Sequence, residues 1–106
     1  GRAWAIWLKS QRGKKMVTLF AHHGVKDYDK WRSGYDGNAE LIKKYGVVED
    51  SVHRAVDENA VIVTHRFKDL ETARAFLQLF GSDEMAGQLQ EMGVVQPVTM
   101  WLGEDV

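Results

Sequence analysis

The stretch MVTLFAHHGVKDYDKW, residues 16–31, constrains the fold most, because it joins a strand, a turn and the start of a helix. Its first six residues are rich in β-branched and aromatic side chains and are too few for a helix, which predicts a strand. The glycine that follows the two histidines ends this strand. Asp27 can then cap a helix that begins near Tyr28, with Val25 and Trp31 spaced to form a hydrophobic staple.

The remainder of the chain has the patterns of two helical regions and three further strands. Aromatic and aliphatic residues recur at three- and four-residue steps as far as Tyr45, which predicts a helix. Two glycines predict a break in that helix over residues 33–38, where Asn38 could cap a second segment. Gly46 suits a left-handed stop at its end. The other elements predicted are strands over 47–56, 60–67 and 94–102, a helix from Asp69 to Gly81, and a short helical turn from Ser82 to Gly93.

This order, β-α-β-β-α-β, predicts an α+β fold of the ferredoxin-like type, an antiparallel sheet with its helices on one face. Pro97 cannot donate a ladder hydrogen bond, which favours an edge position for the last strand. Alternate residues of a strand face opposite sides of the sheet, and both sides carry apolar residues. Leu19 and Phe20, or Val63 and Ile62, are examples. The helices cover one face only, so we expect a second copy to cover the other and form a dimeric α+β barrel with a lined space between the two sheets.

The charges divide the chain in two. Residues 1–15 hold five basic residues and no acid, whereas residues 16–106 hold nine basic and fifteen acidic residues. We therefore interpret 1–15 as an N-terminal extension and 16–106 as one domain. The extension is open to three interpretations: tag-derived or upstream-read sequence, an arm that packs Trp4 and Trp7 on the body or a partner, or a basic membrane-surface segment.

Composition also narrows the classes of partner and compartment. An acidic body argues against a nucleic-acid surface, which needs clustered Lys and Arg on one face. No apolar run reaches the ~18 residues of a membrane span, and no membrane partner is expected for the domain of residues 16–106. The chain has no cysteine, hence no disulfide framework, and a reducing cytoplasm is the expected compartment.

Several motifs resemble those of the dimeric α+β-barrel superfamily that includes antibiotic-biosynthesis monooxygenases and haem-degrading oxygenases. Residues 23–31 resemble the H-x-V-x-D-Y-x-x-W signature of one uncharacterised branch, and residues 57–61 resemble its D-D-P-N-x-V turn, with Glu58 in place of proline. The segments 67–71 and 93–97 are also similar. The resemblance implies a homodimer with a mostly apolar pocket, and in the monooxygenase branch oxidation without metal or flavin. The haem-degrading Asn/Trp/His set is incomplete here, and the monooxygenase Asn and Trp cannot be placed.

The histidines are the candidate catalytic residues. His22 and His23 are adjacent and point to opposite faces, so at most three histidines could converge, and we predict no metal site. His23 and His65 lie on strands that are neighbours in this fold and could act as an acid/base pair if both face the barrel interior. The resemblance favours that direction, because positions matching Ala21 and Phe67 line the pocket in oxygenase relatives. The alternative is a satisfied polar pair at the pocket rim.

Aromatic residues supply the candidate ligand contacts, namely Phe67, Trp101, Tyr28 and Trp31, with His53 as a secondary candidate whose face depends on the hairpin register. A core position is the alternative for Trp31. The sequence thus predicts a protein that binds a small apolar or aromatic molecule without a cofactor, with monooxygenation, isomerisation or cyclisation as candidate reactions. A non-catalytic assembly module is the alternative, so enzyme activity is left open. An enzyme should have a cavity of ~300 Å³ or more.

Overall fold

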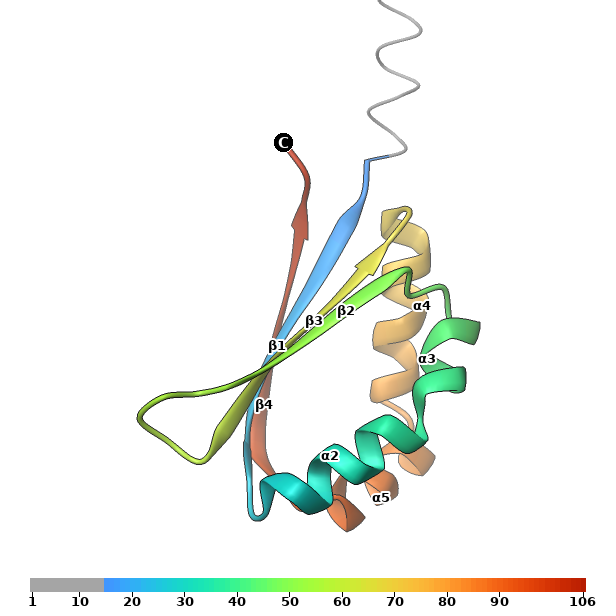
Figure 1. The fold of residues 1–106 in the computed structure, drawn as a ribbon. Helices are drawn as coiled ribbons and strands as arrows, with labels where there is room; N and C mark the ends of the chain where they lie inside the picture. The colour runs from blue at the N-terminus through green and yellow to red at the C-terminus, as the bar shows by residue number, and fades with distance from the viewer. Residues whose placement is uncertain (1–14) are drawn as a thin grey trace, which may run out of the picture.

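The computed structural model describes residues 15–106, in which every strand predicted from the sequence is present (Figure 1). The first helix is split into two, and the predicted turn before the last strand is a nine-residue helix. The elements are β1 (Val17–Val25), α2 (Tyr28–Gly37), α3 (Ala39–Lys44), β2 (Glu49–Arg54), β3 (Ala60–Phe67), α4 (Leu70–Phe80), α5 (Asp83–Glu91) and β4 (Val94–Glu104). The N-terminal extension lies outside the described residues, apart from Lys15. Over the described part of the chain, no helix combines the length and hydropathy needed to cross a membrane.

Three helices begin at the capping residues expected from the sequence. The side chains of Asp27, Asp69 and Ser82 each accept a hydrogen bond from the backbone N–H three residues later, at 3.1, 2.8 and 3.2 Å. Each cap contributes about 1 kcal/mol by satisfying an N–H that the helix cannot. Asn38 lies between α2 and α3 as expected, but its side chain makes no capping hydrogen bond to α3. Its amide is therefore available for another role.

The break between α3 and β2 requires a glycine. Gly46 has a φ of +94°, the left-handed region that side chains rarely adopt, and a Cβ there would overlap the Thr72 methyl of α4. The chain can therefore reverse tightly at Gly46 and enter β2 while staying in contact with α4.

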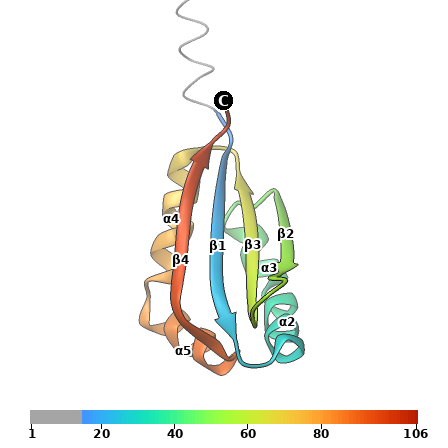
Figure 2. The same cartoon turned by 90° about the vertical axis from the view of Figure 1, so that its left-hand side faces the viewer.

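The strands form one antiparallel sheet in the order β2-β3-β1-β4 (Figure 2). This is the ferredoxin-like order, and it confirms that β4 is an edge strand able to tolerate Pro97. The pairing of β1 with β4 shifts between His22 and Gly24, so His23 has no partner on β4. A bulge of this kind re-aims nearby side chains.

The two faces of the sheet differ because alternate residues of each strand point to opposite sides. Val17 and Leu19 of β1 and Val63 of β3 are buried under the four helices. Side chains of the other parity form what we call the bare face, on which Phe20, Ile62 and Trp101 are 41%, 39% and 56% exposed. The same parity includes Thr18, His22, Glu49, Ser51, His53, Thr64, Arg66, Thr99 and Gly103.

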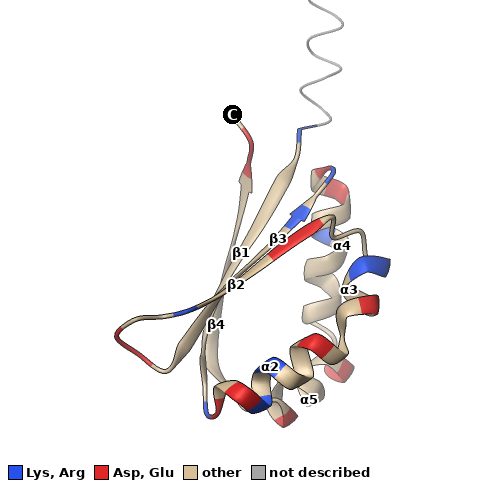
Figure 3. Ribbon diagram, viewed as in Figure 1, with Lys and Arg blue, Asp and Glu red and all other residues tan. Residues whose placement is uncertain are grey.

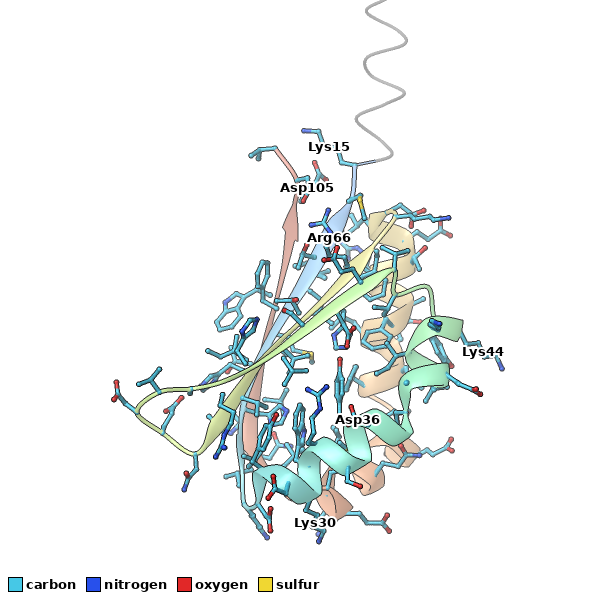
Figure 4. All side chains as sticks on the ribbon, viewed as in Figure 1. Lys15, Lys30, Asp36, Lys44, Arg66 and Asp105 are labelled. Atoms are coloured by element: carbon cyan, nitrogen blue, oxygen red, sulfur yellow. The ribbon has the colours of Figure 1, made fainter. Side chains whose placement is uncertain are left out.

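Charged residues are concentrated on the helices, the β2–β3 turn and the strand ends, whereas the middle of the sheet is uncharged (Figure 3). At the end where β1 begins and β4 finishes, Arg66 lies beside Asp105 with a nitrogen–oxygen distance of 3.0 Å (Figure 4). The backbone N–H of Asp105 also donates to the carbonyl of Met16. These contacts hold the C-terminal residues on the sheet, although a partly exposed ion pair of this kind contributes at most ~1 kcal/mol.

Candidate functional site

The candidate site is a small cavity between the sheet and the helices, on the side opposite the bare face. Its floor is formed by β1, β3 and β4, and its walls by α2, α3, α4 and the ends of α5. The cavity has a volume of about 60 Å³. Nearly all of its lining is apolar, and the polar side chains that reach it are His23, Tyr35, Asn38 and His65. An apolar cavity with a few convergent polar groups is the usual form of a small-molecule site.

A line of packed rings connects the two histidines. His23 meets Trp31 edge-on with ring centroids 5.7 Å apart, and Trp31 stacks on Tyr35 at 5.1 Å. Tyr35 lies 6.0 Å from His65, which in turn contacts Phe76 at 5.1 Å. Trp31 and Tyr35 are four residues apart on α2, which places their side chains on the same helix face. The helix therefore positions both rings over the sheet between the histidines.

His65 is the most constrained polar residue of the site, with only 3% of its surface exposed. The hydroxyl of Tyr35 donates to a carboxylate oxygen of Asp50 at 2.7 Å, and its oxygen lies 3.0 Å from Nε2 of His65. Because that hydroxyl hydrogen is already used, Nε2 must carry the hydrogen and donate it to the tyrosine oxygen. The lone pair of His65 is then on Nδ1, which is buried and has no hydrogen-bond partner among residues 15–106.

Burial keeps His65 neutral: desolvation lowers its pKa to about 4, against a smaller raising effect of the Asp50 charge. A buried nitrogen acceptor without a donor costs about 1–3 kcal/mol. That cost is removed when a bound molecule donates a hydrogen bond to Nδ1. The site is thus prepared to receive a hydroxyl or amine hydrogen.

His23 presents a second acceptor. Its Nδ1 lies 2.9 Å from the carbonyl oxygen of Gly24, which can only accept, so Nδ1 carries the hydrogen and Nε2 the lone pair. The side chain is 6% exposed, and burial lowers its pKa below the ordinary histidine value, with a smaller raising effect from the hydrogen bond to Gly24. Both histidines therefore act as neutral acceptors near neutral pH.

The lowered pKa of His65 predicts a loss of stability in mild acid. The unfolded chain takes up a proton near pH 6.5 and the folded chain only near pH 4, so the unfolded state binds more protons between these values. We expect the stability that His65 contributes to be complete above pH 6.5 and to fall by about 3 kcal/mol as the pH drops through 4. Urea unfolding of wild type and His65→Leu at pH 7, 5.5 and 4 would measure this. An equal pH dependence in both proteins would contradict it.

The structure corrects the predicted direction of the histidines. His23 and His65 both lie beneath the helices, so the expectation that they face a space between two sheets is wrong. The strands are apolar at both parities, and only the tertiary packing decides which parity the helices cover. The histidines nevertheless line one cavity together, and their use as catalytic residues stays a prediction.

The other residues predicted to contact a ligand lie in three places: the cavity, the core and the surface. Trp31 lines the cavity and is also a core residue. Phe67 is fully buried in the core against Phe76, with ring centroids 5.3 Å apart, and does not line the cavity. Trp101 and His53 lie on the bare face, and His53 bonds Ser51 there at 3.0 Å. Tyr28 packs beside the Trp31 ring and beneath the Arg54 guanidinium rather than on the cavity.

The sequence interpretation missed the polar partners of His65. The sequence placed Tyr35 on the apolar stripe of its helix and among the candidate pocket walls, without a hydrogen-bonding role, and it placed Asp50 only in a strand. Asp50 has the same parity as the half-buried Val52 and lies directly opposite His65 in the β2–β3 register. An acidic residue among the inward-facing positions of a strand was the available signal. Its pairing with His65 could be recognised only once the register of β2 against β3 was known. Asn38 was expected only as a cap.

The cavity is smaller than the ~300 Å³ expected of an enzyme. About 60 Å³ holds a few water molecules. A ring would require lining side chains to move, and three of them, Met85, Met92 and Met100, are flexible methionines. Phe80, Val98 and Met100 also line an outer groove of about 520 Å³ between α5 and β4, which adjoins the cavity. Within residues 15–106 no three His, Cys, Asp or Glu side chains are grouped as metal ligands.

Comparison with known proteins supports the fold. No protein-family model matches the chain, and no curated protein matches it by sequence. Among solved structures, a proposed antibiotic biosynthesis monooxygenase from Caulobacter crescentus superposes with a TM-score of 0.67 at 12% identity, covering 94% of this chain and 98% of that one. SnoaB, a cofactor-independent oxygenase from Streptomyces nogalater, gives 0.61 at 16% identity, covering 87% and 92%. A dimeric ferredoxin-like protein from an uncultured marine organism gives 0.61 at 17%, covering 87% and 96%.

These similarities confirm the ferredoxin-like α+β fold and the predicted structural resemblance to antibiotic-biosynthesis monooxygenases. At 12–17% identity they concern the fold alone, so activity must be argued from the cavity.

Proposed function

We propose that this chain, which shares its fold with a cofactor-independent oxygenase, binds a small molecule bearing a ring hydroxyl and removes the proton of that hydroxyl with His65. The observation that carries the proposal is the buried Nδ1 of His65, a neutral acceptor with no partner among the described residues. A phenol or enol is the ligand class that satisfies it, because its ring suits the apolar walls and its hydroxyl supplies the missing donor.

The second histidine narrows the ligand further. Nε2 of His23 is an acceptor like Nδ1 of His65, so neither lone-pair nitrogen of the two histidines offers a hydrogen to a carbonyl. The amide of Asn38 can donate as well as accept, and it lies at the same cavity. A ring with one or two hydroxyls therefore suits the histidines, and a carbonyl on the same molecule would be directed to Asn38.

Proton removal would leave an electron-rich phenolate or enolate. Such an anion can react with dioxygen as the oxidant, and we place this reaction first because SnoaB, of the same fold, is described as a cofactor-independent oxygenase. Isomerisation or cyclisation could start from the same anion. In each case the chain supplies binding, exclusion of water and a neutral base, and His65 is the catalytic residue.

A matched pair of probes tests the binding step. Para-cresol and toluene differ only by the hydroxyl, and calorimetry should show para-cresol binding tighter by about 1–3 kcal/mol, which is about 5- to 150-fold in Kd. His65→Phe should bring the two affinities close together, and His23→Phe should reduce the preference in part. His22→Phe is the control, because His22 adjoins His23 but points to the bare face. Equal binding of both probes to wild type would contradict the proposal.

The catalytic step is tested separately. Oxygen uptake with a hydroquinone should exceed the protein-free rate in wild type and His22→Phe, and should fall in His65→Phe. Binding without oxygen uptake would favour a binding module over an oxygenase. Absence of binding for both probes, with an intact dimer, would favour the assembly module considered from the sequence.

We also infer that the bare face pairs with a second copy of the chain. Phe20, Ile62 and Trp101 expose large apolar surfaces on the bare face. The middle of the sheet carries no Lys, Arg, Asp or Glu (Figure 3). A patch of this kind on an open sheet indicates an interaction surface. The similarity to a dimeric ferredoxin-like protein supports a homodimer, and the exposed apolar residues make the bare face its proposed interface. In this arrangement the cavities lie on the outer sides of the sheets, under the helices.

A further inference from the structure

A hydrogen-bonded chain leads from the cavity to the protein surface. It starts at Nε2 of His65, which lies 3.0 Å from the oxygen of Tyr35, and continues from the hydroxyl of Tyr35 to Oδ2 of Asp50 at 2.7 Å. His65 is 97% buried by surface area, whereas Asp50 is exposed on the edge strand β2. The chain therefore spans the wall of the cavity.

The hydrogen atoms of this chain all have one direction. The carboxylate of Asp50 is an acceptor only, so Tyr35 donates to it and accepts from His65. Burial and the bond to Asp50 raise the pKa of Tyr35 well above its ordinary value, so the hydroxyl keeps its hydrogen at neutral pH. The stacked Trp31 ring holds Tyr35 in position. This order of donors fixes the tautomer that leaves the lone pair on Nδ1 of His65, a buried atom of a residue that lines the cavity.

We propose that Asp50 and Tyr35 are positioning residues that orient His65 as a base, a proposal that rests on the proposed function. They also carry to solvent the proton that His65 takes from the ligand. As the ligand O–H bond breaks, an Nδ1–H bond forms on His65. The Nε2 hydrogen passes to the oxygen of Tyr35, whose own hydrogen passes to Asp50 and from there to water. The electron pair stays on the ligand oxygen, so no group is oxidised or reduced in this step.

The hydrogen-bonded chain ends at Asp50 in a surface groove of about 310 Å³. This groove shares Tyr35 and Ile42 with the cavity lining. The titratable groups facing this chain come from four elements. They are Arg32, Tyr35 and Asp36 of α2, Lys43 of α3, Glu49 and Asp50 of β2, and His65 of β3, while α4 contributes the uncharged Phe76.

Asp36 provides a matched control for Asp50. Its carboxylate pairs with Arg32 at 3.1 Å and makes no hydrogen bond to Tyr35, although it lines the same groove. Both Asp36→Asn and Asp50→Asn remove one negative charge from that groove. Only the second breaks the proton route, because an asparagine in place of Asp50 can accept from Tyr35 but cannot take its proton.

The experiment uses para-nitrophenol, whose anion absorbs visible light, bound to the full chain. The pH at which the bound probe is half ionised should rise by about one unit or more in Asp50→Asn, because His65 loses the charge that favours its protonation. Tyr35→Phe should give a similar rise, and the double variant should give no more than Tyr35→Phe, because both residues act through one chain. Asp36→Asn should stay close to wild type. Equal shifts for the two aspartate variants, or additive shifts in the double variant, would overturn the proposal.

A ligand-free measurement separates this proposal from the proposed function. Long-range proton–nitrogen NMR correlations report which ring nitrogen of His65 carries the hydrogen. We expect the hydrogen on Nε2 in wild type, a mixture of tautomers in Tyr35→Phe, and protonation at lower pH in Asp50→Asn than in Asp36→Asn. If para-nitrophenol fails to bind while these NMR results are obtained, the proposed function is contradicted. The orientation of His65 by Tyr35 and Asp50 is then still supported. If Nδ1 of His65 carries the hydrogen in the wild-type protein, the proposed hydrogen-bonded chain from His65 to Asp50 is overturned.

Discussion

Phe67→Ala is expected to lower the free energy of unfolding by about 3–5 kcal/mol. Phe67 is completely buried at the end of β3, where it pairs across the sheet with Val17 and packs its ring on Phe76 of α4. Removing the ring loses its transfer free energy and leaves a space that the rigid strand cannot fill. Urea unfolding at several protein concentrations would measure the change and separate it from any effect of dimerisation.

This substitution also distinguishes a core residue from a ligand contact. The folded fraction of Phe67→Ala should keep the preference for para-cresol over toluene, because Phe67 does not line the cavity. Leu70→Ala is a suitable control, since Leu70 is 38% exposed at the start of α4 and should cost far less. A loss below 1 kcal/mol together with a loss of binding would restore the original prediction that Phe67 contacts the ligand.

Trp101→Arg is expected to convert the proposed dimer into a monomer. Trp101 is the most exposed large residue of the bare face and lies directly opposite Phe20 in the β1–β4 pairing. Tryptophans at the centre of an interface commonly contribute about 2–4 kcal/mol, so the dimer Kd should rise about 30- to 1,000-fold. A buried unpaired guanidinium adds to this cost. Analytical ultracentrifugation across a concentration series would measure it.

Leu70→Arg is the matched control for the dimer, because it places the same charge on the helix side of the sheet. It should leave the dimer Kd unchanged. Cavity binding per chain should also persist in Trp101→Arg, since the cavity lies on the opposite side of the sheet. A wild-type chain that sediments as a monomer at micromolar concentration would contradict the barrel arrangement.

Much of the fold could be predicted because the signals were local. Asp27, Asp69 and Ser82 cap helices through bonds to residues three positions away. Pro97 marked an edge strand, and Gly46 marked a left-handed stop. In each case the short sequence segment contains the whole physical cause.

The site was predicted less well because its causes are not local. Both parities of β1 and β3 are apolar, so the pattern could not decide which parity lies under the helices. His23, His65 and Trp31 were assigned to a site and do share a cavity, but in a different layer from the one expected. The bond between Tyr35 and Asp50 joins residues of α2 and β2, and depends on a strand register that no single segment determines.

The sheet that separates cavity from bare face has a practical consequence for protein engineering. Along β1, Leu19, Ala21 and His23 face the cavity, whereas Phe20 and His22 between them face the bare face. A combinatorial library that varies only Leu19, Ala21 and His23 would therefore alter ligand selectivity with the assembly surface intact. A library of Phe20 and His22 would redesign assembly around an unchanged pocket. One nine-residue strand thus offers two independent design surfaces, interleaved residue by residue.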